Sequence, residues 1–394
     1  MIKPGVIESA REVFLRACAS LHPADWDAQE PILRTVDARA WEIVTNLAMR
    51  HGLLGLVARN LEWAHARTGV PIPILDRTRA WRQAHLIQML VYRNAARRVT
   101  EALAVSGIRF VIFKGMALAE LVYRDLSLRT FRDCDLLVDR NDLEAAYAIL
   151  REFGYSPVQY RSLPEYFVRD KFGANMRHSD GSSIDLHWAI QGYEMRPSDP
   201  EIIWRCCRQP EISQELPGWR MSPELMLVNL ASHFQVHEYE EIKPLVDFYQ
   251  TAVTLGERID IDEVRGTARA LGMAQTVDLA ARLCERLFPQ NPMVGRLAAG
   301  SPSPHRRLAL GVLTAASLLP LDKIRPTERR LRGLICHGAI SLSARAFRKM
   351  LIPKARELEV RFGQRFNIRM YPRYYMVQAY RLLARSRKSF SDLA

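Results

Sequence analysis

Apolar residues recur every three or four positions along the first quarter of the chain. Two long stretches, Ala40 to Leu61 and Ala80 to Val99, carry this spacing. It gathers the apolar side chains on one face of a helix, where they can pack into a core. The pattern therefore predicts an N-terminal helical region over residues 1–98.

The pattern changes after Gly107. Ile108 to Phe113 and Cys134 to Val138 are short apolar runs of the kind found in buried strands. Met116 to Tyr123 and Asp142 to Phe153 have the spacing of helices instead. Strands and helices that alternate over so short a distance predict an α/β unit.

A hairpin is predicted next along the chain. Asp180-Gly181 is a favoured two-residue turn between antiparallel strands. In the run after it, Ile184 and Leu186 share one face and Asp185 points to the other. The core sheet is therefore expected to be mixed, with a strand-helix unit joined to an antiparallel hairpin.

The later part of the chain has helical spacing again. Ser222-Pro223-Glu224 is typical of a helix start, with a capping hydroxyl, a proline and an early acid. The predicted fold class is α/β (α+β), a small mixed β-sheet core embedded in a mostly helical chain. Its expected regions are an N-terminal helical region over 1–98, the sheet core over 99–192, a helical domain over 193–300 and a basic helical region over 301–394.

The positive charge of the chain is concentrated near its C-terminus. The chain has 394 residues, 48% hydrophobic and 25% charged, which is ordinary for a globular protein. The net charge is +13, yet residues 323–394 alone hold 18 Lys and Arg against 4 Asp and Glu. Basic charge interleaved with aromatic rings suits RNA, an acidic peptide or an anionic membrane surface. The same aromatic spacing also fits the core of a helical subdomain.

Cysteine and hydropathy patterns exclude several classes. The six cysteines form no C-x-x-C pair, so the zinc and thioredoxin-like spacings are absent. No apolar run is long enough to cross a membrane, and the N-terminus lacks the pattern of a signal peptide. We therefore expect a cytoplasmic protein with no transmembrane segment.

The most informative polar residues are three aspartates on the predicted strands. Asp133 and Asp135 are two apart, so a strand projects them to the same side, where their charges repel unless a cation lies between them. Asp185 joins them if its strand lies beside Cys134 to Val138. Three such carboxylates can hold two Mg²⁺ ions for phosphoryl or nucleotidyl displacement. The alternative is a solvated strand end.

A lysine-glycine pair and an arginine are the candidates for phosphate binding. Lys114-Gly115 ends the first strand and opens a helix, where backbone N–H groups and the ammonium charge favour an anion. The alternative is a turn glycine with a solvent-exposed lysine. Arg129 either holds a phosphate through its planar fork or neutralises Asp133.

Three histidines remain open between functional and structural roles. His187 shares the face of Asp185 and either orients a metal-bound water or makes a structural hydrogen bond. His233 and His237 lie four apart on a predicted helix, a spacing that permits metal binding but lacks a third ligand.

Together, these motifs resemble the uncharacterised bacterial nucleotidyltransferase family of the DNA polymerase β-like superfamily. The resemblance extends over about residues 30–250. The segments that carry it are Phe113-Lys114-Gly115-Met116-Ala117-Leu118, Tyr123, Leu128-Arg129, Asp133-Cys134-Asp135-Leu136-Leu137-Val138 and Ile184-Asp185-Leu186-His187-Trp188.

The resemblance implies an enzyme that transfers a nucleoside monophosphate from an NTP, with ATP as the expected donor, and releases pyrophosphate. It implies that Asp133 and Asp135 bind two Mg²⁺ or Mn²⁺ ions and that Asp185 shares one of them near the attacking group. Lys114 and Gly115 then occupy the phosphate-binding turn, with Arg129 as a phosphate or structural partner.

One departure concerns the phosphate turn. The superfamily usually carries Gly-Ser or Gly-Gly shortly before the first acid, whereas this chain has Gly115-Met116 and no hydroxyl there.

The acceptor is open: a small molecule, a peptide or a protein. The alternatives are an RNA- or tRNA-directed nucleotidyltransferase that docks through residues 323–394, and a catalytically inactive binding module of the same fold.

Overall fold

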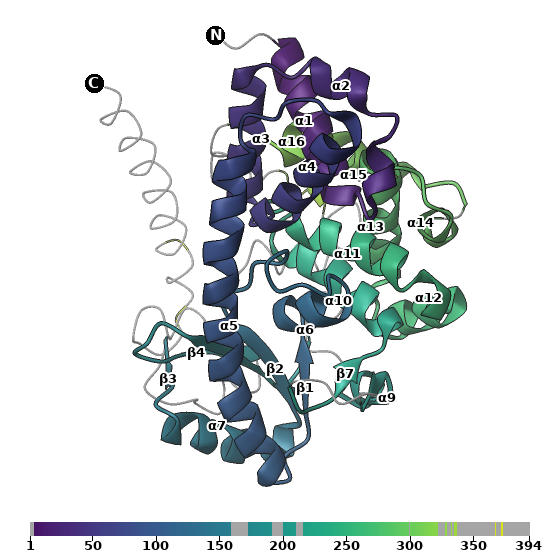
Figure 1. Ribbon diagram of the computed structural model, residues 1–394. Helices are drawn as coiled ribbons and strands as arrows, with labels where there is room; N and C mark the ends of the chain where they lie inside the picture. Colours follow the sequence, from purple (N-terminus) through teal and green to yellow (C-terminus); the bar gives the residue numbers. More distant parts are fainter. Residues whose placement is uncertain are drawn as a thin grey trace.

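The computed structural model describes residues 4–158, 172–190, 200–209, 216–298 and 300–321, with six further positions. Within these residues, helices surround a small sheet at one end of the molecule (Figure 1). This is the mixed α/β class predicted from the sequence. The basic region 323–394 lies outside the described residues except at Glu328, Arg332, Ile335, Cys336, Asn367 and Pro372.

The first helices pack against one another at the end of the molecule farthest from the sheet (Figure 1). The predicted helical stretch from Ala40 to Leu61 is divided into two because Gly52 adopts a positive φ of 64°, which ends the first helix. The elements here are α1 (Pro4–Ala19), η1 (Pro23–Trp26), α2 (Glu30–Arg34), α3 (Ala38–Arg50) and α4 (Leu54–Thr68).

One long helix, α5 (Leu75–Val105), connects the two ends of the molecule (Figure 1). Its first part contacts α4, and its last part packs against the sheet and α7 (Leu143–Glu152). The predicted boundary after residue 98 falls inside this helix.

The sheet has five strands in the order β1-β2-β5-β4-β3. β1 runs antiparallel to β2, β2 and β5 are parallel, and β4 and β3 continue antiparallel. The predicted hairpin at residues 180–181 joins β4 to β5 and is confirmed. The bounds are β1 (Phe110–Phe113), β2 (Cys134–Val138), β3 (Ser156–Pro157), β4 (Gly173–Arg177) and β5 (Ser183–His187).

The later helices complete one apolar core with the first ones. Buried residues of α1, α3 and α4 form a single cluster with those of the helices after residue 220, while a second cluster lies between the sheet, α5 and α7. Ser222 caps α10, as predicted. The elements after β5 are α9 (Pro200–Arg205), β6 (Cys207–Arg208), β7 (Arg220–Met221), α10 (Pro223–Val236), α11 (Lys243–Thr254), η4 (Gly256–Arg258), α12 (Ile261–Ala270), α13 (Ala274–Leu287), α14 (Pro292–Leu297), α15 (Pro304–Val312) and α16 (Ala315–Leu318).

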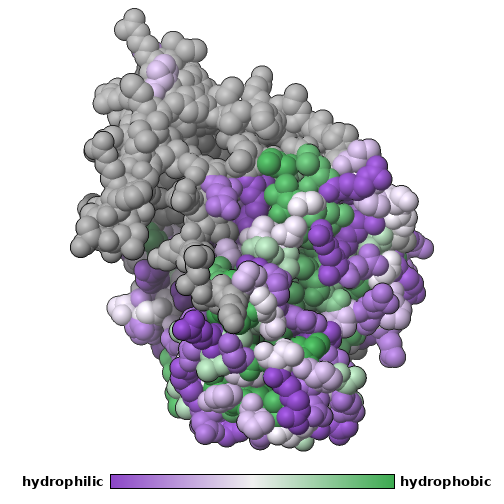
Figure 2. All heavy atoms as spheres, turned by 90° about the horizontal axis from the view of Figure 1, so that it is seen from above, coloured by the Kyte–Doolittle hydropathy of each residue, from purple (hydrophilic) through white to green (hydrophobic). Residues whose placement is uncertain are grey.

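The described surface is mixed in character. Seen from the end that carries the first helices, hydrophilic residues alternate with smaller hydrophobic areas (Figure 2). Among the described residues, no helix is both long and apolar enough to span a membrane.

A buried histidine links the two groups of helices and makes stability depend on pH. His51 follows α3, and its Nδ1 accepts a hydrogen bond of 3.4 Å from the backbone N–H of Ile242. Burial, aided by the charges of Arg50 and Lys243, lowers the pKa of His51 to about 4. As pH falls below about 6.5, the unfolded chain takes up this proton before the folded chain does, so stability falls.

We predict that the free energy of unfolding contributed by His51 drops by about 3 kcal/mol between pH 7.5 and pH 4. Urea unfolding of the wild type and of His51→Gln across this range measures the difference. The variant should lose less stability on acidification. Identical pH profiles for the two proteins would contradict the role given to His51.

Candidate functional site

Two aspartates lie side by side at the centre of the sheet. Asp135 on β2 and Asp185 on β5 are direct partners in the parallel pairing of these strands. His187, two residues further along β5, lies on the same side. One ligand atom from each of the three residues lies within 4.8 Å of the others, so the group can hold a metal ion. The sequence predicted that Asp185 joins Asp135 if their two strands are neighbours, and β2 and β5 are neighbours.

Asp135 is the most strongly bonded carboxylate of the group. Its Oδ1 accepts a hydrogen bond of 2.7 Å from Lys114 Nζ and one of 3.0 Å from His187 Nε2. Burial alone would raise the pKa of Asp135, but the Lys114 charge and the His187 hydrogen bond outweigh it and hold the pKa well below its ordinary value. Asp135 is therefore a permanent negative charge.

The position of His187 follows from its strand and one neighbouring ring. The imidazole stands edge-on to Phe113, with ring centroids 5.0 Å apart. Because the Asp135 carboxylate can only accept, Nε2 carries the proton in their hydrogen bond. His187 thus makes a hydrogen bond to Asp135, as one of the two alternatives left open by the sequence predicted.

Asp185 is held by a neighbour that the sequence did not single out. Asn175 on β4 donates to Asp185 Oδ1 and also to Ser183 Oγ, the latter over 2.8 Å. Asn175 is the register partner of Asp185. Only the pairing of β4 with β5 brings them together, so no local sequence signal identifies Asn175.

Asp133 lies in the bend just before β2, outside the compact group of three. Burial and the negative charges of Asp135 and Asp185 raise its pKa to about 7. An added cation favours the ionised form of a carboxyl group in such surroundings. The predicted pair Asp133 and Asp135 is therefore close enough to interact electrostatically.

The turn at the end of β1 is strained. Lys114 has φ 53° and ψ −129°, a conformation that residues with a side chain rarely adopt. Gly115 opens α6 (Gly115–Leu121) against Phe131, and a Cβ there would lie 2.7 Å from the Cβ of Phe131. The turn thus packs directly on the segment before Asp133, and the strain directs the Lys114 ammonium group onto Asp135.

Arg129 has a buried partner in the described structure. Its Nε and Nη2 atoms donate to both oxygens of Asp247 on α11 over 2.7–3.0 Å, and Tyr123 donates its hydroxyl to the same carboxylate over 2.7 Å. The sequence had paired Arg129 with a phosphate or with Asp133. The guanidinium group of Arg129 is instead bonded to Asp247. This ion pair connects α11 with the segment that carries Asp133.

His233 lies on α10, and His237 directly follows the end of this helix. Their rings are 4.4 Å apart and nearly perpendicular. Burial first, and then the charges of Lys114 and His237, hold the pKa of His233 well below its ordinary value. Among the described residues, the group with metal-ligand geometry is that of Asp135, Asp185 and His187, without either of these histidines.

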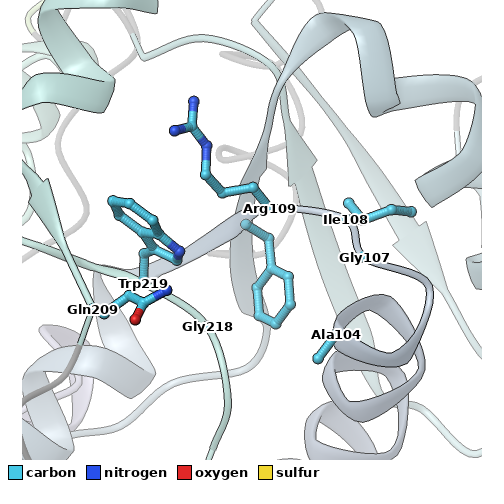
Figure 3. Close-up of a pocket in the computed structure, with 8 residues that line it drawn as sticks. Ala104, Gly107, Ile108, Arg109, Gln209, Gly218 and Trp219 are labelled. Atoms are coloured by element: carbon cyan, nitrogen blue, oxygen red, sulfur yellow. The ribbon is translucent and has the colours of Figure 1, made fainter.

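A separate cleft lies at the other end of β1. It has a volume of about 440 Å³, and Arg109, Gln209 and Trp219 line its mouth (Figure 3). The Arg109 guanidinium lies 4.1 Å from the ring centre of Trp204 and 5.3 Å from that of Trp219. The cleft shares no lining residue with the acidic group.

We predict that Asp247→Asn destabilises the fold by about 3–5 kcal/mol, because it leaves the buried Arg129 charge without its partner. The control is Asp27→Asn, which weakens the exposed ion pair with Arg67 and should leave the stability nearly unchanged. Urea denaturation measures both. Equal losses would show that the Arg129 pair does not brace α11.

The chain is similar to one protein family and to solved structures. Residues 37–289 match the profile of a family described as uncharacterised nucleotidyltransferase. No curated protein matches the chain. Among solved structures, the chain is similar to the solution structure of the antibiotic-resistance factor ANT(2'')-Ia, at 14% identity over 48% of this chain and 90% of that one. The TM-score is 0.32. Because the family profile covers well over half of the sequence, the chain belongs to this family of nucleotidyltransferases.

Proposed function

We propose that the protein transfers a nucleoside monophosphate from an NTP, with ATP as the preferred donor, to a nucleophilic group of an acceptor. In this reaction a bond forms between the acceptor and the α-phosphorus, the bond from the α-phosphorus to its bridging oxygen breaks, and pyrophosphate leaves. The observation that carries the proposal is the pairing of Asp135 with Asp185 across β2 and β5, with Asp133 beside them.

The donor set fits a divalent metal. Mg²⁺ prefers carboxylate oxygens, and two carboxylates with an imidazole converge here within 4.8 Å. Burial first, and then the negative charges of Asp135 and Asp185, raise the pKa of Asp133, so a cation bound there would favour its ionised form. In the proposed site Asp133, Asp135 and Asp185 hold two Mg²⁺ ions, and Mn²⁺ substitutes for them.

When bound, the two metal ions supply positive charge to the attacking and leaving oxygens of the displacement. The protein's own residues do the positioning. Asp185 lies near the attacking group, with its carboxylate fixed by Asn175. His187 keeps Asp135 oriented, and Lys114 brings a flexible cation to the same carboxylate, from which it can reach a phosphate. Gly115 has no side chain, so the turn that carries Lys114 can pack closely against Phe131.

The acceptor is proposed to be a small molecule, a peptide or a protein. Docking of RNA through residues 323–394 stays a prediction, because that region lies almost wholly outside the described residues. The same holds for a cytoplasmic location. The intact set of three aspartates favours an active enzyme over a binding module that has lost turnover.

The test is isothermal titration of the four NTPs in the presence of Mg²⁺. We expect one NTP, ATP first among them, to bind the wild type and to lose that binding in Asp133→Asn/Asp135→Asn. The matched control is Asp76→Asn, which removes an exposed carboxylate on α5 and should bind as the wild type does. Binding that needs no metal, or that is retained in the double variant, would contradict the assignment of Asp133 and Asp135 as metal ligands.

Turnover gives a second test. Asp135→Asn should lower pyrophosphate release during nucleotide transfer by at least about a thousandfold, because it removes a proposed ligand of the metal ions that would stabilise the charge of the transition state. Its circular dichroism spectrum should match that of the wild type. A purified Asp135→Asn protein that releases pyrophosphate at the wild-type rate would contradict the assignment.

A further inference from the structure

A half-buried cation near the acidic group comes from α11. Lys243 is the first residue of α11, and its side chain lies along the turn between α3 and α4. Gly52 in that turn leaves room for it: a Cβ at Gly52 would lie 3.4 Å from the Lys243 ammonium nitrogen. The ammonium group is therefore enclosed between α11 and the first helices.

The brace on α11 fixes the direction of this lysine. Lys243 and Asp247 are four residues apart, so they lie on the same face of the helix. Asp247 holds Arg129, which precedes Asp133 by four residues. The face of α11 that carries Lys243 is thus docked on the segment that leads to Asp133, and the charges of Lys243 and Asp133 act on each other.

Lys243 has no bonded counter-charge among the described residues. The neighbouring Asp247 already accepts from Arg129 and Tyr123, so its oxygens are committed. Burial, together with the charge of Arg129, lowers the pKa of Lys243 to about 8, so the group is still mostly protonated at neutral pH. Partial burial of a cation without a bonded counter-charge costs stability.

The position of Lys243 on its helix is unfavourable as well. The first turn of a helix carries the positive end of the helix dipole and favours acids. α11 has no acid in its first turn and a lysine as its first residue. A residue that breaks two local rules of stability is expected to serve a ligand.

We propose that Lys243 binds the polyphosphate of the nucleotide, opposite Lys114, and so supplies the contact that Met116 cannot make. The inference rests on the proposed function, since it takes the substrate to be an NTP. The chemical group recognised is a linear di- or triphosphate. Lys114 reaches it from the sheet, and Lys243 reaches it from the helical region, so a bound nucleotide bridges the two.

The probes are inorganic tripolyphosphate, ATP and AMP, titrated calorimetrically with Mg²⁺ into the full-length protein. Lys243→Met should weaken binding of tripolyphosphate and ATP by about ten- to hundredfold, the effect of losing one charged hydrogen bond. AMP affinity should stay unchanged, because AMP lacks the outer phosphates. Lys243→Arg should restore most of the loss.

Two controls separate binding from structure. Arg67→Met removes one positive charge from an exposed pair and should bind all three probes as the wild type does. The melting temperature of Lys243→Met should equal or exceed that of the wild type, because the variant lacks a half-buried charge that has no bonded partner. If Lys243 only neutralised Asp133, the Lys243→Met variant would instead melt at a lower temperature than the wild type and bind tripolyphosphate equally well.

The outcomes distinguish this inference from the proposed function. If Lys243→Met binds tripolyphosphate and ATP as tightly as the wild type, the role of Lys243 is wrong while the nucleotidyltransferase site stands. If the wild type binds tripolyphosphate through Lys243 but transfers no nucleotide, the polyphosphate site stands and the proposed function fails. If the wild type binds none of the probes, the inference is overturned.

Discussion

The site depends on mutual repulsion between carboxylates that the sheet forces together. The parallel pairing of β2 with β5 places Asp135 directly beside Asp185. Asp133 lies in the bend just before β2. Burial and the charges of Asp135 and Asp185 oppose the ionisation of Asp133 and raise its pKa, so a bound cation would favour the ionised site. Lys114 compensates one charge through a strained turn. Much of the surrounding structure serves to hold these like charges in place.

The helices contribute to the site through a single buried network. Arg129, Tyr123 and Asp247 join the segment before Asp133 to α11, and α11 in turn carries Lys243. Buried residues of the first and the later helices share one apolar cluster, so α11 is supported from both sides. The sheet supplies the carboxylates, and the helical region supplies the brace and a second cation.

Much of the fold was predictable because hydrophobic spacing reports burial locally. The strand at Cys134 to Val138, the hairpin at residues 180–181 and the capped start of α10 all follow from short patterns. Strand geometry predicted a common face for Asp133 and Asp135, but Asp133 lies in the bend before β2 and interacts with Asp135 through its charge. The pairing of Asp185 with Asp135 depended on strand order, which local patterns do not determine.

The missed features are all contacts between distant segments. Asn175 meets Asp185 only through the register of β4 with β5. Asp247 gave a partial signal, as an acid within an apolar helical run, but nothing in the sequence named Arg129 as its partner. Lys243 gave another, as a lysine at a helix start. Such residues stand out because they conflict with local rules, and only the tertiary structure shows what compensates them.

The most direct test of the central claim is to locate the metal. Crystals grown with Mn²⁺ and a non-hydrolysable ATP analogue, measured at the manganese absorption edge, reveal the ions by their anomalous scattering. The account predicts peaks between the carboxylates of Asp135 and Asp185, with Asp133 as a further ligand and the phosphates beside Lys114. Nucleotide bound elsewhere, such as the cleft at Arg109, with no manganese at the aspartates and Lys114 still bonded to Asp135, would contradict it.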